Sequence, residues 1–104
     1  MEKQEFSFFG REKWEEKYCV LTNVGLLYYA NPLQPPQDLF PILDCDIVGV
    51  KRGQPGFTQG YESFRFVYSL REVTFRCPSK SDYDQWLKII LQLQKDSLAK
   101  RKEL

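Results

Sequence analysis

The chain has 104 residues, of which 42% are hydrophobic, and this length provides for one domain with one core. Its net charge of +1 excludes attraction to nucleic acid or anionic membranes through overall charge, so such binding would need a local basic patch. No apolar run is long enough to span a bilayer, and the N-terminal segment lacks the apolar core and cleavage site of a secretory signal.

Short runs rich in aromatic and β-branched residues predict a series of antiparallel strands. Asn23 and Gly25 predict a tight turn between the second and third strands, because both residue types tolerate positive φ. The proline-rich stretch 31–38 and the glycine-rich stretch 53–60 predict loops. The predicted strands cover residues 5–9, 16–22, 26–30, 39–43, 45–52, 62–70 and 72–77.

The apolar period changes after the last strand, and residues from about 80 to 98 are predicted to form one amphipathic helix. Ser79 and Asp82 resemble a capping box at its start. Trp86 is the largest side chain of its apolar stripe, so we expect the indole to close one end of the β-structure. Residues 1–104 are therefore predicted to form a single all-β domain with one C-terminal α-helix, built as two packed sheets or a partly open barrel capped by the helix.

The order of these elements resembles the pleckstrin homology (PH) domain family. WEEKYCVLTNVGLLYY at 14–29 is similar to the family's tryptophan-led second strand and its hairpin into the third. PILDCDIVGV at 41–50 is similar to the fourth and fifth strands, and VTFRCPSKSDYDQWLKIIL at 73–91 to the last strand and closing helix. The resemblance implies a seven-stranded, strongly bent sandwich capped by the helix. It also implies a non-catalytic binding module of a larger signalling or trafficking protein.

Many members of the family bind phosphoinositide headgroups at the open end opposite the helix, with one cation near the end of the first strand and a basic-x-basic pair in the second. In this chain the resemblance places the first cation at or near Phe8 and Phe9, and the pair at Glu15 and Lys17. Only Lys17 is basic. Glu15 is expected to repel phosphate and to pair with Lys17 or Lys13, which predicts weak headgroup binding of low specificity.

A diffuse basic surface around Lys17 is the candidate site. Because Tyr28 and Tyr29 point to opposite faces of a strand, one can pack in the core while the other offers a hydroxyl near the site. The candidate headgroup-binding residues are Arg11, Lys13, Lys17, Tyr29, Lys51 and Arg52, and Phe9 is the candidate membrane contact. A second interpretation is equally open, because Arg11, Lys13 and Lys17 alternate with Glu12, Glu15 and Glu16, as in a solvated loop that neutralises itself.

Two functions follow from these alternatives. In the first, the module recruits or orients its parent protein at membranes through weak, low-specificity binding of phosphoinositides or other anionic lipids. In the second, it is a protein-interaction or intramolecular regulatory module with no significant lipid binding. Glu15, the missing first-strand cation and the proline-rich loop favour the second function. The partner would be a small GTPase, a neighbouring domain or an added strand at an exposed sheet edge.

The sequence predicts no catalytic activity, no metal site and no cofactor. It contains no histidine, nucleophile motif or phosphate-binding glycine loop. Cys19, Cys45 and Cys77 are widely separated among strand-forming residues, which predicts buried, reduced thiols rather than metal ligands. We therefore expect a cytoplasmic adaptor module that can associate peripherally with membranes and does not bind nucleic acid.

Overall fold

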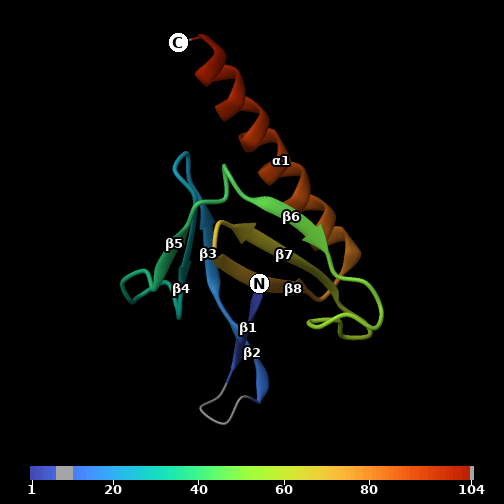
Figure 1. The fold of residues 1–104 in the computed structure, drawn as a ribbon. Helices are drawn as coiled ribbons and strands as arrows, with labels where there is room; N and C mark the ends of the chain where they lie inside the picture. Colours follow the sequence, from blue (N-terminus) through green and yellow to red (C-terminus); the bar gives the residue numbers. More distant parts are fainter. Residues whose placement is uncertain (7–10, 104) are drawn as a thin grey trace.

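The structure is a computed structural model that describes residues 1–6 and 11–103, and its body consists of two antiparallel sheets and one helix (Figure 1). The strand order is β2-β1-β8-β7-β6 in the first sheet and β3-β4-β5 in the second. This arrangement confirms the predicted mostly-β fold with a C-terminal helix, and it is not a closed barrel. The described elements are β1 (Glu2–Phe6), β2 (Glu12–Glu16), β3 (Tyr18–Leu21), β4 (Leu26–Tyr29), β5 (Asp38–Phe40), β6 (Asp46–Gly49), β7 (Glu62–Tyr68), β8 (Arg71–Cys77) and α1 (Lys80–Glu103).

The strand predicted at 16–22 is in fact the second part of a longer extended segment. β2 and β3 follow one another around Lys17, and they pair with different sheets: β2 with β1, and β3 with β4. The charged residues of β2 have low intrinsic strand preference, so the sequence pattern predicts a loop there. Tertiary pairing with β1, from Glu2↔Glu16 to Phe6↔Glu12, decides the outcome instead. β1 itself begins earlier than predicted, and residues 7–9 of the predicted first strand lie outside the described residues.

Aromatic side chains from the two sheets form the core. Phe64 of β7 lies opposite Phe75 of β8 in the sheet register, and both are fully buried. The ring of Phe64 packs edge-on against Phe66 at 4.8 Å and against Tyr83 of α1 at 5.1 Å between centroids. Such edge-to-face pairs add specific geometry to the burial of apolar area. Further fully buried side chains are Leu26, Phe40, Ile42 and Ile90.

The helix α1 caps the sheets as predicted, but Ile90 is its buried anchor rather than Trp86. Ile90 is 0% exposed, whereas Trp86 is only partly buried at the margin of the core. The predicted cap at the helix start is confirmed, because the Asp82 amide donates to the Ser79 hydroxyl at 3.2 Å. Farther along, the Gln94 side chain donates to the carbonyl of Ile42 at 2.8 Å, and the end of the helix projects beyond the sheets (Figure 1).

The predicted turn between the second and third strands is present. The Gly25 amide donates to the Thr22 hydroxyl at 3.1 Å, and the Thr22 amide donates to the Gly25 carbonyl at 2.9 Å. A Cβ atom at Gly25 would lie 2.4 Å from the Phe40 carbonyl oxygen, so a side chain at this position would push β4 and β5 apart.

The three thiols are free. Cys45 and Cys77 are buried and Cys19 is partly buried, and burial raises the pKa of the Cys45 and Cys77 thiols to about 11. Their thiolate forms are therefore rare near neutral pH, and buried thiols of this kind are unreactive. No helix in the described part of the chain combines the length and the apolar character needed to cross a membrane.

Candidate functional site

The candidate site lies where the strand β2–β3 passes from one sheet to the other. At this point the Lys17 amide donates to the Met1 carbonyl at 2.8 Å, and the Met1 amino group donates back to the Lys17 carbonyl at 3.1 Å. This reciprocal pair ends the β1–β2 ladder. The register that it completes places Lys3 opposite Glu15 and Glu5 opposite Lys13. Because directly opposed residues point to the same face, one face of this hairpin gathers five charged side chains.

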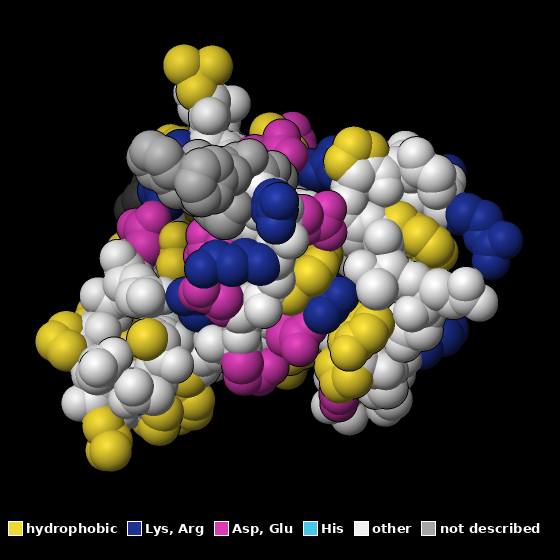
Figure 2. All heavy atoms as spheres, turned by 90° about the horizontal axis from the view of Figure 1, so that it is seen from below, with side chains coloured by type: hydrophobic (Ala, Val, Ile, Leu, Met, Phe, Trp, Pro, Cys, Tyr) yellow, Lys and Arg dark blue, Asp and Glu magenta, His cyan; other side chains and the backbone are white. Residues whose placement is uncertain are grey.

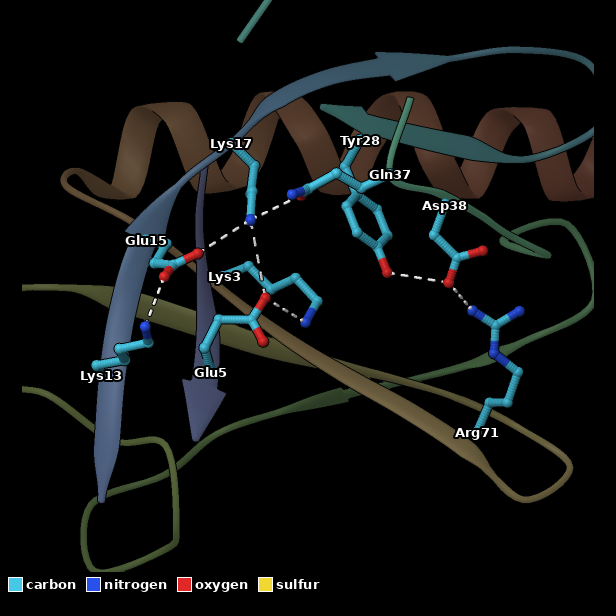
Figure 3. Close-up of polar contacts among 9 residues, drawn as sticks. All are labelled: Lys3, Glu5, Lys13, Glu15, Lys17, Tyr28, Gln37, Asp38 and Arg71. Atoms are coloured by element: carbon cyan, nitrogen blue, oxygen red, sulfur yellow. Dashed lines mark hydrogen bonds and ion pairs between the residues drawn. The ribbon is translucent and has the colours of Figure 1, made fainter. Parts of the chain in front are cut away.

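These five side chains form an alternating chain of charges (Figure 3). Lys13 Nζ lies 2.8 Å from Glu15 Oε1, and the other oxygen of Glu15 lies 3.1 Å from Lys17 Nζ. Lys17 Nζ is also 3.8 Å from Glu5 Oε1, and the same oxygen accepts a hydrogen bond from Lys3 at 2.9 Å. Each of the three lysines in this cluster thus has a carboxylate neighbour, which confirms the expected pairing of Glu15 with Lys13 and Lys17.

Lys17 is the centre of this arrangement and is only 4% exposed. Its ammonium group also donates to the Gln37 side-chain oxygen at 2.7 Å. A buried ammonium needs such partners, because an unpaired charge in a water-poor environment is strongly unfavourable. Gln37 belongs to the proline-rich loop. Its backbone amide donates to the Tyr28 carbonyl at 2.8 Å, so this loop is fixed against β4.

The charges of the site nearly neutralise one another. Three lysines (+3) and two glutamates (−2) give the cluster a net charge of +1. Hydrogen bonds from Lys13 and Lys17 hold the pKa of the Glu15 carboxyl below its ordinary value, and Glu15 in turn raises the pKa of Lys13. Figure 2 shows the same balance at the surface, where lysine, arginine and acidic side chains are interleaved on one face of the molecule.

A second polar group adjoins the cluster. The Tyr28 hydroxyl donates to Asp38 Oδ2 at 3.1 Å, and Arg71 pairs with the same carboxylate oxygen at 2.5 Å. Lys3 Nζ lies 5.6 Å from the centroid of the Tyr28 ring, which links this group to the charged cluster. Burial, together with the Asp38 carboxylate, raises the pKa of Tyr28 to about 12.

The structure brings together only part of the predicted residue set. Tyr28, and not Tyr29, places its hydroxyl beside the cluster, while the Tyr29 ring packs against Tyr18 on the outer face of the second sheet. Lys51 and Arg52 are exposed in the turn after β6, at the opposite edge of the first sheet from β2.

Two other predicted residues lie near the β1–β2 hairpin. Arg11 is exposed and immediately precedes β2, close in sequence to Lys13. Phe9, the predicted membrane contact, lies outside the described residues, as does Phe8.

Lys3, Glu5 and Gln37 are members of the site that the sequence pattern did not predict. Because β1 starts at Glu2, the first strand contributes one cation to the cluster, Lys3, near its beginning. The family's cation near the end of that strand falls at Phe8 and Phe9, which lie outside the described residues. The alternation of Lys3 and Glu5 is the signal that could have placed both on one face. Gln37 carries no such signal, because its position depends on how the loop folds back to β4.

On the outer face of the first sheet, the side chain of Arg76 holds β2 in place. The Arg76 guanidinium lies between two aromatic rings, 4.3 Å from the centroid of Trp14 and 4.0 Å from that of Tyr61. It also pairs with Glu2 and donates to Thr58 at 3.1 Å. The contact of Arg76 with Trp14 therefore holds β2, the strand that carries Lys13 and Glu15, against the rest of the sheet.

Two antiparallel sheets with a single C-terminal helix are consistent with the PH fold. The sequence model of the PH domain family matches residues 1–95, and the chain belongs to this family. PH domains are generally non-catalytic modules for lipid or protein interaction. A search of curated proteins found no match to the chain.

Proposed function

We propose that the chain is a non-catalytic PH module that recruits or orients a larger signalling or trafficking protein at membranes through weak, low-specificity binding of phosphoinositides or other anionic lipids. In this function the module acts in the cytoplasm and associates peripherally with the membrane. The observation that carries the proposal is the five-residue cluster itself. Its three cations converge as phosphate recognition requires, and its two carboxylates limit the strength of that recognition.

The cations that remain accessible support diffuse attraction rather than tight coordination. Lys13 is 54% exposed at the rim of the cluster, and Arg11 is exposed beside it. Lys51 and Arg52 add positive charge at the far edge of the same sheet. Exposed charges separated in this way act through long-range attraction, which salt screens.

Vesicle co-sedimentation tests this function. Vesicles of phosphatidylcholine are compared with vesicles that also contain mono-, bis- or tris-phosphorylated phosphoinositides. We expect the wild-type chain to sediment preferentially with the phosphoinositide vesicles at low salt, to lose this binding smoothly as salt increases, and to discriminate little between phosphate positions. Lys13→Gln should weaken binding, while Lys88→Gln, at an exposed position on α1, should not. Equal sedimentation with neutral and phosphoinositide vesicles would refute the proposal.

A second candidate function, protein binding, is favoured by the outer face of the second sheet. This face carries apolar and aromatic side chains on three adjacent strands: Tyr18, Val20, Leu27, Tyr29 and Leu39. Tyr18 is 50% exposed and Leu39 is 39% exposed, although the outer face of an antiparallel sheet is usually polar. Such a face suits a protein partner, such as a small GTPase or a neighbouring domain, that offers apolar side chains. Under this function the wild-type chain would ignore phosphoinositide vesicles even at low salt.

A further inference from the structure

The helix α1 carries a second stripe of side chains beside the one that packs on the sheets. The packed stripe includes Tyr83, Ile90 and Gln94, through which α1 contacts the two sheets. The second stripe repeats at alternating intervals of four and three residues, the spacing with which two α-helices pack along each other in a coiled coil. We call this stripe the α1 seam, and its members are Asp82, Trp86, Ile89, Leu93, Asp96 and Lys100.

The middle of the α1 seam is apolar and accessible. Ile89 is 51% exposed, while Trp86 and Leu93 are partly buried. One hollow lies between Ile89, Trp86 and Leu21 of β3, and a second lies beside Ile89 and Leu93. A third extends from Leu93 to Lys100, beside the turn between β3 and β4. Because neighbouring hollows share a residue, they form one groove along the seam, about 20 Å long at the rise of an α-helix.

The apolar residues of the seam match those of a second copy that runs in the opposite direction. Reversal about the midpoint of the seam places Ile89 of one copy opposite Leu93 of the other, and Leu93 opposite Ile89. These two layers form an apolar centre. Next to it, the indole N–H of Trp86 meets the Asp96 carboxylate of the second copy, which is a suitable acceptor.

The charges at the ends of the seam also match in this arrangement. Asp82 lies in the first turn of α1 and meets Lys100 of the second copy, and both side chains are exposed. Two copies in parallel would instead place like charges opposite each other. The C-terminal end of α1 projects beyond the sheets, so the sheets leave that part of the seam open (Figure 1).

We propose that a second copy of this chain docks on the α1 seam, so that the chain forms a symmetric dimer through antiparallel α1 helices. A two-fold symmetric contact uses the same surface on both copies, and the order of residues in the seam makes this surface complementary to itself. The contact between two helices is smaller than the roughly 1,600 Å² of a standard interface, so the expected dissociation constant is on the order of 10–100 µM. This self-association goes beyond the proposed function, because it uses none of the residues of the charged cluster.

The first test compares two apolar positions of α1 with nearly equal exposure. Ile89 on the seam is 51% exposed, and Leu91, which is about 200° farther around the helix, is 49% exposed. Association of the full chain is measured by sedimentation velocity over about 5–500 µM protein. We expect Ile89→Lys to raise the dissociation constant at least about tenfold, because an ammonium group enters the apolar centre. Leu91→Lys adds the same charge and should stay within about twofold of the wild-type chain.

The second test uses the two ends of the seam. Asp82→Lys places two cations opposite each other, and Lys100→Asp places two carboxylates opposite each other, so each variant alone should associate at least about fivefold more weakly. An equimolar mixture of the two variants restores both ion pairs and should associate as the wild-type chain does. Lys100 is exposed near the end of the helix, so Lys100→Asp remains informative if Asp82→Lys disturbs the helix start.

Three results would overturn the proposal. The first is a wild-type chain that stays monomeric at about 500 µM, well above the expected dissociation constant, which would leave the α1 seam to a helix of a different protein. The second is an equal effect of Ile89→Lys and Leu91→Lys, which would place the contact elsewhere. The third is a mixture of the two charge variants that associates no better than either variant alone.

Discussion

The buried anchor of the helical cap can be tested with two adjacent isoleucines. Ile90 is 0% exposed and Ile89 is 51% exposed, although they have the same chemistry and neighbouring positions on α1. Ile90→Ala removes three buried carbons, which corresponds to about 2.4 kcal/mol of transfer free energy at about 0.8 kcal/mol for each. The cavity left behind adds to this cost, and the better helix preference of alanine offsets a few tenths of a kcal/mol. The expected loss is about 3 kcal/mol.

Ile89→Ala provides the matched control. Half of its side chain is already in water, so about 1.2 kcal/mol of transfer free energy is lost and part of that is offset by helix preference. We expect a net cost of about 0.5–1 kcal/mol. The free energies of unfolding are measured by urea denaturation, with the slope used to confirm that both variants unfold in the same way. Equal costs for the two variants would refute the assignment of Ile90 as the anchor of the cap.

The remaining predictions concern the polar groups around the sheets. Because the folded state raises the pKa of Tyr28 from 10.0 to about 12, the contribution of its neutral hydroxyl to the free energy of unfolding is fully present below pH about 10. This contribution is lost as pH rises to about 12, by up to about 3 kcal/mol. Tyr28→Phe should flatten this alkaline loss in urea unfolding experiments. Arg76→Lys should lower the free energy of unfolding by about 1–2 kcal/mol, because an ammonium group cannot replace a guanidinium stacked between two rings. Arg101 pairs with Asp44, and the Arg101 side chain is 55% exposed, so Arg101→Lys should change the free energy of unfolding by less than about 0.5 kcal/mol.

Much of the fold follows from local sequence patterns, because those patterns and the tertiary structure agree. The helix start at Ser79 and the turn at Gly25 depend on single residues with strong local preferences, and both are present. β2 shows where such reasoning fails. Its charged side chains favour a loop, and only pairing with β1 and the clamp of Arg76 on Trp14 make it a strand. Those contacts join residues distant in sequence, which a local pattern does not contain.

The candidate site divides in the same way. The pairing of Glu15 with Lys13 and Lys17 was predictable, because alternate residues of one strand share a face. The position of β1 was not, since its pairing register determines that Lys3 and Glu5 join them. The partial burial of Trp86 was also unpredictable, because helical spacing gives the direction of a side chain and not its depth.

The position of Lys17 connects the fold to the proposed site. Its backbone ends the β1–β2 ladder, while its side chain reaches Gln37 in the loop between β4 and β5. A buried ammonium at the junction of two sheets is stable only while polar partners surround it. Lys17 therefore ties the packing of the two sheets to the charge balance of the cluster, because its partners come from β1, β2 and the loop between β4 and β5.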